Sequence, residues 1–376
     1  MFLCRLLLGL AEAAFGPGLP FYLSFFFRRD ELAFRTGIFI SAAPLASSFA
    51  STLAYAIVGM GNRTRIQPWR LLFLLEGFPS VFVGVWAWSR IPDSPATARW
   101  LTPRERKIAT IRLRQKDQED LNEKTTHNAG MVRRSQFHGL AWREVAKTLG
   151  DPKSYLTAAM FFSVNVAFSS MPVFEPMIVK AIGYSALAAQ GLSALPHLFA
   201  FVVVLLAAWL SDRWRTRSSL IIGAALMALT GFFLLAMSQP MHLPDILRYL
   251  TLFPITAGFF TAVTLVIVWT LDNQESAEGK GTGVALLNII GQIGSLLGGF
   301  LYPESHGPYF AVDHAICAGF MLAVAGLALG LRVLLQSKNR SSQSSTAYEM
   351  VFAEDEDNDQ AEVPKPLQDK TFTYLL

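Results

Sequence analysis

Two charged residues lie inside the first apolar segment of the chain, where charge is costly. Arg5 and Glu12 stand seven residues apart in a segment that extends over residues 1–27. A charge at the centre of a membrane helix costs about 2.5–3.5 kcal/mol on insertion scales. Seven residues are nearly two helical turns, so both side chains are expected on one face, about 10 Å apart.

A guanidinium suits a carboxylate ligand and a carboxyl group suits proton binding. We predict anion binding by Arg5 and proton coupling by Glu12. Snorkelling of Arg5 and a structural partner for Glu12 are equally compatible with these two residues alone.

Further polar residues interrupt the later apolar segments. Asn165 is one, and Asn288 and Gln292 lie one helical turn apart in another. All three are predicted to face the interior of a helical bundle as substrate contacts, although polar residues between membrane helices serve in packing about as often. Glu76, close to Pro79, is predicted to have a gating or structural role, and a structural hydrogen bond is favoured.

Three more features have mainly structural interpretations. His197 follows a proline and is expected to be structural rather than a proton relay. Glu175 precedes Pro176 and is expected at an outer helix end, in contact with water. The spacing of Gly294 and Gly298 is typical of closely packed membrane helices.

The composition indicates what kind of elements carry these residues. Of the 376 residues, 52% are hydrophobic and 16% are charged, whereas soluble domains have roughly 25% charged residues. A membrane helix needs about 20 apolar residues, and no alternating strand pattern is present. The sequence therefore predicts an all-α membrane protein with nine spans, at residues 1–27, 36–60, 69–91, 154–178, 185–210, 218–238, 247–271, 281–302 and 312–335.

Other classes of protein are disfavoured by the same residues. The six His and two Cys show no metal-ligand spacing, and no glycine-rich phosphate loop is followed by Lys. We expect no cofactor, no metal and no enzymatic activity. The net charge of +4 resides in short clusters between apolar segments, which is typical of membrane orientation rather than nucleic-acid binding.

The charged clusters predict the orientation. They occupy residues 28–35, 212–217 and 90–153, where 14 Lys/Arg exceed 8 Asp/Glu. Alternating spans place all three on one side, which the positive-inside rule makes cytoplasmic. The segment 61–70, with Arg63, Arg65 and Arg70, is an exception on the outer side.

The long central loop divides the spans three before and six after. We expect a partial amino-terminal bundle at 1–91 and a cytoplasmic loop at 92–153, with an amphipathic helix that starts at a Thr102–Glu105 capping box. A six-helix bundle at 154–336 and a disordered cytoplasmic tail at 337–376 follow. Transporters are often built from duplicated six-helix bundles, so three helices are expected to be missing at the front, as in a truncated sequence.

Several motifs resemble the major facilitator superfamily, in particular the anion:cation symporter family of fungal allantoate, nicotinate and pantothenate permeases. The most specific is Arg5-Leu-Leu-Leu-Gly9-Leu-Ala-Glu12 with Pro17 and Gly18, which is similar to the family's fourth helix. The segments 27–35, 69–77, 92–95 and 100–106 are also similar, and Ser211-Asp212-Arg213 to Arg217 resembles the superfamily's basic loop motif. The resemblance covers residues 1–336.

The resemblance implies proton-coupled symport of a small organic anion by alternating access. It adds weight to roles for Arg5 and Glu12, and it implies gating or structural roles for Asp212, Arg213 and Arg217. A multi-pass protein of the plasma membrane is expected, with protons, an organic anion and lipid as its partners, and as a monomer. A non-transporting nutrient sensor or regulatory fragment is the alternative, because the missing helices would leave the cavity incomplete.

Overall fold

The chain is all helix in a computed structural model that describes residues 2–13, 15–60, 67–122, 141–274, 276–307, 309–357 and 374–376. No strand occurs in these ranges. The helices are α1 (Phe2–Glu12), α2 (Phe15–Leu23), α3 (Arg29–Met60), α4 (Pro68–Arg90), α5 (Pro103–Asn122), α6 (Trp142–Leu149), α7 (Pro152–Ala181), α8 (Ala186–Leu192), α9 (Ala194–Trp214), α10 (Ser218–Ala236), α11 (Asp245–Leu250), α12 (Leu252–Asp272), α13 (Ala277–Gly298) and α14 (Ala311–Asp357).

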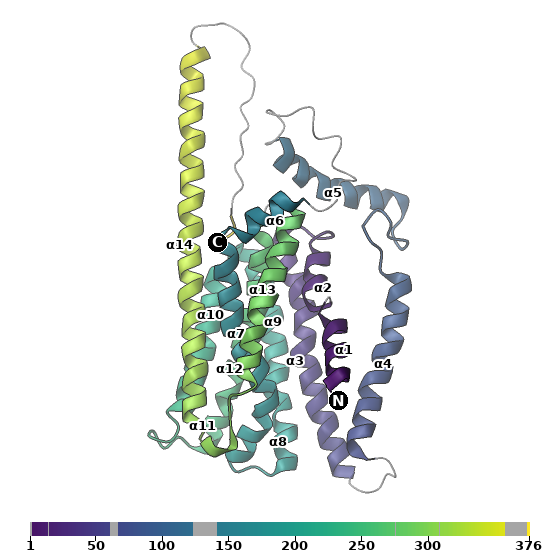
Figure 1. The fold of residues 1–376 in the computed structure, drawn as a ribbon, viewed down its shortest axis with the longest axis vertical. Helices are drawn as coiled ribbons and strands as arrows, with labels where there is room; N and C mark the ends of the chain where they lie inside the picture. Colours follow the sequence, from purple (N-terminus) through teal and green to yellow (C-terminus); the bar gives the residue numbers. More distant parts are fainter. Residues whose placement is uncertain are drawn as a thin grey trace.

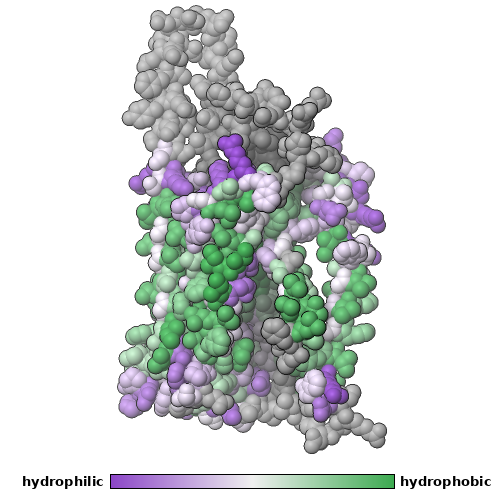
Figure 2. Space-filling model, viewed as in Figure 1, coloured by the Kyte–Doolittle hydropathy of each residue, from purple (hydrophilic) through white to green (hydrophobic). Residues whose placement is uncertain are grey.

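All nine predicted spans coincide with apolar helical segments. Within the described ranges, nine such segments are long and apolar enough to cross a membrane, from Leu6–Leu23 to Ala311–Ser341. Figure 2 shows hydrophobic residues in a band between more hydrophilic ends on the face in view. The prediction of an all-helical, multi-pass membrane protein is confirmed.

The first span differs from its prediction in having a break. The sequence predicts one helix over 1–27, but α1 ends at Glu12 and α2 starts at Phe15. Pro17 follows closely, and its ring nitrogen has no hydrogen to donate to the carbonyl of Ala13 in a continuous helix. The break therefore lies directly after Glu12.

The later helices form a compact bundle with α12 at its centre. Helices α7, α9 and α10 pack against α12, and α14 packs against α10 and α7 (Figure 1). Residues 252–271 contain no charged side chain, and nearly all of α12 is buried. A helix that is apolar all round belongs in the middle of a bundle.

Glycines bring α13 close to α7. A methyl group placed on Gly294 would lie 2.1 Å from the carbonyl oxygen of Phe162, and one on Gly298 would lie 2.4 Å from that of Val166. No other residue fits such a backbone approach. The predicted close-packing role of Gly294 and Gly298 is confirmed.

The first part of the chain contacts this bundle mainly through α3, which packs against α9. A methyl group on Gly37 of α3 would lie 2.5 Å from Cβ of Ala208 on α9. By contrast, α4 is exposed along most of its length, with Trp88 at 92%, and Figure 1 shows it standing apart from the other helices.

The connections at one end of the molecule include the described parts of all three predicted charged clusters. We call this end, with α5 and α6 (Figure 1, top), the central-loop face. The capping box is present, because the Thr102 amide donates to Glu105 Oε2 at 2.8 Å and the Glu105 amide donates to Thr102 Oγ1 at 3.3 Å. Arg112 of α5 pairs with Glu31 of α3. Arg63 and Arg65, the exception to the charge pattern, lie outside the described residues.

The predicted disordered tail is wrong for its first part. The last span was expected to end at residue 335, but α14 continues to Asp357. No Gly or Pro stands between Gly330 and Pro364 to stop it. The helix therefore extends well beyond the apolar segment.

Candidate functional site

A buried arginine at the central-loop face contacts several polar groups from both parts of the chain. Helix α9 ends where Arg215 adopts a left-handed conformation (φ 53°), which is a common way to turn a chain out of a helix. The turn places Arg217 immediately before α10. Its side chain is only 1% exposed.

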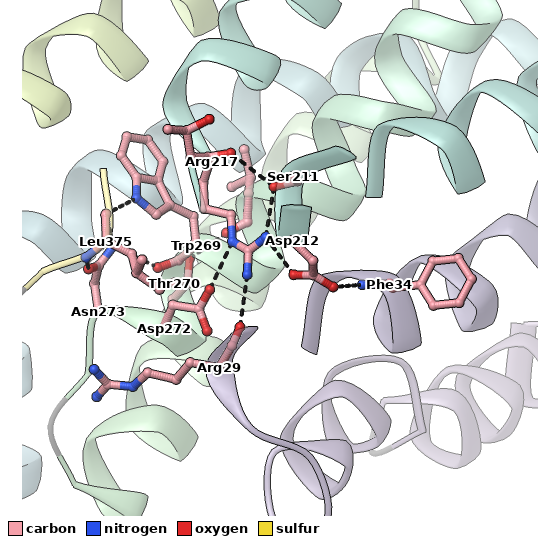
Figure 3. Close-up of polar contacts among 12 residues, drawn as sticks. Arg29, Phe34, Ser211, Asp212, Arg217, Trp269, Thr270, Asp272, Asn273 and Leu375 are labelled. Atoms are coloured by element: carbon pink, nitrogen blue, oxygen red, sulfur yellow. Dashed lines mark hydrogen bonds and ion pairs between the residues drawn. The ribbon is translucent and has the colours of Figure 1, made fainter. Parts of the chain in front are cut away.

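The Arg217 guanidinium binds two carboxylates (Figure 3). Its Nη1 lies 2.7 Å from Asp212 Oδ1, and its Nε donates to Asp272 Oδ2 at 3.0 Å. Nη1 also donates to Ser211 Oγ at 2.8 Å, and Nη2 donates to the carbonyl oxygen of Arg29 at 2.9 Å. All three guanidinium nitrogens are thus satisfied, as a buried arginine requires. These five residues are called the Arg217 cluster.

The cluster joins the two parts of the chain. Arg29 and Phe34 belong to α3, whereas Asp212, Arg217 and Asp272 come from the later bundle. The Phe34 amide donates to Asp212 Oδ2 at 2.7 Å, and Arg29 Nη2 donates to the carbonyl of Gln274 at 3.3 Å. A carboxylate near the first turns of a helix is also favoured by the helix dipole.

The stability of the Arg217 cluster depends on the pairing of the Arg217 charge with both carboxylates. Burial by itself lowers the pKa of Arg217, but Asp272 and Asp212 outweigh that effect and raise its pKa above the usual value. The guanidinium therefore stays charged at any physiological pH. Asp272 is fully buried. If α3 and α9 moved away from the start of α10 and the end of α12, the charges of Asp212, Arg217 and Asp272 would lose their partners or become exposed.

The last residues of the chain also contact this end of the bundle. The Arg217 amide donates to the carbonyl of Leu376 at 2.6 Å, and Trp269 Nε1 donates to that of Leu375 at 2.8 Å. Asn273 and Leu375 exchange two hydrogen bonds. The Lys153 ammonium lies 4.0 Å from the ring centroid of Tyr374.

The residues predicted for anion and proton binding lie on α1. Arg5 is in this helix, but its side chain is outside the part that the structure describes. Glu12 is the last residue of α1 and is exposed. Glu76 is exposed on α4, where Ser80 Oγ bonds its carbonyl and not its carboxyl group. Their proposed roles remain predictions.

The predicted polar contacts in the later bundle do not form one buried group. Asn165 is 3% exposed on α7 and its Nδ2 has no hydrogen-bond partner. Asn288 is half-buried and donates to the carbonyl of Val284 at 2.9 Å, whereas Gln292 is exposed. The face of α13 toward α7 is occupied by its glycines, which turns Gln292 away from that contact.

Comparison with known proteins decides the family. The model of the Major Facilitator Superfamily matches residues 1–299 of the chain. The chain belongs to this superfamily. The wider resemblance seen in the sequence is thereby confirmed, whereas membership of the anion:cation symporter family remains a prediction.

Curated relatives of this superfamily member are named as transporters. "MFS transporter prlL" of a fungal species is 29% identical over 347 residues, which cover 91% of this chain and 66% of that protein. "Putative tartrate transporter" of Agrobacterium vitis is 30% identical over 342 residues, covering 91% of this chain and 70% of that protein. The chain thus spans about two thirds of the length of these relatives. Their names agree with the expectation of a protein that is not an enzyme.

A solved structure shows the same superfamily fold. The proton:xylose symporter XylE, bound to 6-bromo-6-deoxy-D-glucose, aligns with a TM-score of 0.60 at 17% identity, over 81% of this chain and 65% of that protein. The similarity confirms the helical bundle as a major-facilitator-type fold.

The charged residues of this superfamily member were only partly predictable from its sequence. Asp212 and Arg217 were predicted and are central to the cluster, whereas Arg213 is exposed beside it. Asp272 was missed, although a single carboxylate at the end of a 20-residue apolar segment is a usable signal. Glu175 was expected in water, but it is fully buried beside His197. Its neighbour His197 lies on α9, and the local sequence around Glu175 does not reveal that contact.

Proposed function

We propose that this protein is a secondary active transporter which carries a small organic anion together with protons by alternating access. The observation that carries the proposal is the Arg217 cluster. It ties α3 to the later bundle at the central-loop face through two hydrogen bonds, from the Phe34 amide to Asp212 and from Arg217 to the Arg29 carbonyl. Contacts of this kind hold one end of a transporter closed, and they can break without unfolding either side.

The nature of the substrate is proposed from the first span. Arg5 offers a fixed positive charge with the fork geometry that binds carboxylates, and tartrate, named for one relative, is a small dicarboxylate. Asn165, Asn288 and Gln292 are proposed as further polar contacts from the opposite bundle. Roles as packing residues remain the alternative for these three.

Proton coupling is proposed for Glu12. A carboxyl group on the helix that carries Arg5 can bind a proton and change the local charge when the anion is bound. The solved symporter of the same fold is described as a proton symporter. Positive-inside orientation of the central-loop face would make that face cytoplasmic, in a multi-pass protein of the plasma membrane.

Uptake by the reconstituted protein tests the proposal. The purified chain is placed in liposomes with an imposed proton gradient, and uptake of labelled tartrate is compared with that of labelled xylose. We expect gradient-dependent uptake of tartrate and not of xylose. Arg5→Gln should reduce apparent affinity by about tenfold or more, because hydrogen bonds to charged groups contribute about 1.5–3 kcal/mol.

Two variants make the result specific. Lys107→Gln removes an exposed charge of α5 outside the Arg217 cluster and should leave uptake unchanged. Glu12→Gln should retain binding of the anion but lose the effect of the proton gradient. Uptake that is the same in wild type and Arg5→Gln would remove Arg5 from the mechanism.

A further inference from the structure

A carboxyl group and an imidazole are buried together near the end of the bundle opposite the central-loop face. Glu175 of α7 is fully buried and His197 of α9 is 2% exposed. Glu175 Oε2 lies 3.5 Å from His197 Nδ1, which also lies 2.9 Å from the carbonyl oxygen of Ser193. Neither group takes part in the Arg217 cluster.

These two side chains have unusually few polar partners. Both carboxylate oxygens of Glu175 and Nε2 of His197 are buried without a hydrogen bond. Among the described residues, His197 is the basic side chain within ion-pair distance of Glu175. An ionised carboxylate that is buried without compensation costs several kcal/mol, so the protonation state of the pair matters.

The neighbouring helices add no compensating charge. Residues 186–192 of α8, 252–271 of α12 and 281–298 of α13 contain no Asp, Glu, Lys or Arg. From α12, the ring of Phe260 lies 6.1 Å from the His197 ring. The hydroxyl of Tyr249 on α11 donates to the carbonyl of Leu192 at 2.9 Å. Tyr184, after α7, lies beside Tyr249.

The other titratable groups of this region are paired with one another or exposed. His314 of α14 lies 3.1 Å from the hydroxyl of Tyr302, and Cys317 contacts the same hydroxyl. Two ion pairs join Arg248 with Asp245 at 3.3 Å and His306 with Asp313 at 3.0 Å, and the side chains of Lys180 and His242 are exposed. The charge of the Glu175–His197 pair is therefore set by the pair itself.

We propose that Glu175 and His197 form a proton-binding site that holds one proton in this arrangement of helices. With no proton to share, the pair would carry one negative charge in apolar surroundings. One proton makes it neutral overall, either as a carboxylic acid beside a neutral imidazole or as a carboxylate beside an imidazolium. This inference is independent of the proposed transport, because it rests on burial and geometry alone.

The position of the pair gives the bound proton a structural consequence. Ser193, whose carbonyl contacts His197, is the single residue between the end of α8 and the start of α9. Loss of the proton would leave Glu175 charged against α9, and the resulting cost favours separation of α7 from α9 at this end. The site would thus link proton occupancy to the packing of these two helices.

Two spectroscopic measurements on the whole protein in lipid nanodiscs test the site. Infrared difference spectra at neutral pH report a protonated carboxyl group, and ¹⁵N NMR of labelled histidine reports imidazolium. We expect either a carboxylic-acid band that Glu175→Gln removes or an imidazolium signal that His197→Gln removes. Glu105→Gln, which alters an exposed carboxyl group, is the matched control and should remove neither signal.

The outcomes separate cleanly. A band removed by Glu175→Gln places the proton on the carboxyl group, and a signal removed by His197→Gln places it on the imidazole; both support the site. The absence of both from the wild-type protein would overturn the proposal. The histidine spectrum of the wild type needs no Glu175 variant, so the test survives if Glu175→Gln does not fold.

Discussion

Replacement of Arg217 by Gln is expected to destabilise the protein strongly. The change removes the partner of Asp272, which is fully buried and has one oxygen without a hydrogen bond already. Asp212 loses less, because it is partly exposed and still accepts from the Phe34 amide. Removal of one member of a buried ion pair costs about 3–5 kcal/mol. That loss corresponds to a change of about 10²- to 10⁴-fold in the unfolding equilibrium.

Reversible unfolding in mixed micelles, driven by SDS and followed by circular dichroism, measures this loss. The double variant Arg217→Gln, Asp272→Asn should recover about 2 kcal/mol or more relative to Arg217→Gln, because the fully buried side chain at position 272 no longer carries an unpaired charge. Asp272→Asn alone should cost less than Arg217→Gln, because Arg217 keeps its bond to Asp212.

Arg213→Gln is the matched control, since Arg213 is exposed in the same turn and its replacement should change stability by less than about 0.5 kcal/mol. Two results would refute the reasoning. One is an Arg217→Gln variant as stable as the control, and the other is a double variant no more stable than Arg217→Gln.

Three further predictions concern other contacts. Gly294→Ala should cost about 1–3 kcal/mol by the same unfolding assay, because the new methyl group meets the Phe162 carbonyl, whereas Gly319→Ala, with open space around it, should be tolerated. Tyr249→Phe should cost about 1 kcal/mol through loss of its bond to the Leu192 carbonyl; an unchanged midpoint would dismiss that bond. The backbone and side chain of Thr102 hold the pKa of Glu105 below its usual value. The ionised Glu105 therefore stabilises the start of α5 at pH values above the pKa of this group in the unfolded chain. This stabilisation is lost as the pH falls through the pKa of Glu105 in the folded protein. NMR of labelled Thr102 would follow this loss, and Glu105→Gln should abolish its pH dependence.

The sequence was sufficient to predict features that depend on neighbouring residues. Spans of about 20 apolar residues, the Thr102–Glu105 capping box and the glycine spacing on α13 each follow from local geometry. The turn motif from Asp212 to Arg217 was also visible, because charged residues between two apolar segments are conspicuous.

Features that depend on distant segments were not predictable. Glu175 of α7 lies beside His197 of α9, and Asp272 is part of the Arg217 cluster because Arg217, 55 positions earlier, reaches it. The spacing of Arg5 and Glu12 predicts one shared helix face, and both residues lie in α1, but the Arg5 side chain is outside the described part, so the shared face stays a prediction. Spacing alone cannot specify what each side chain meets.

The close contact between Gly37 and Ala208 has a mechanical consequence. It lies about 12 Å along α3 from Arg29 at the Arg217 cluster and roughly 35 Å from Met60 at the other end of the helix, at 1.5 Å per residue. If α3 turns as a rigid rod about this contact, the segment toward Met60 is about three times as long as the segment toward Arg29. Each ångström of movement at the ionic cluster then becomes about three at the far end, so a small rupture of charged contacts suffices for a wide opening elsewhere.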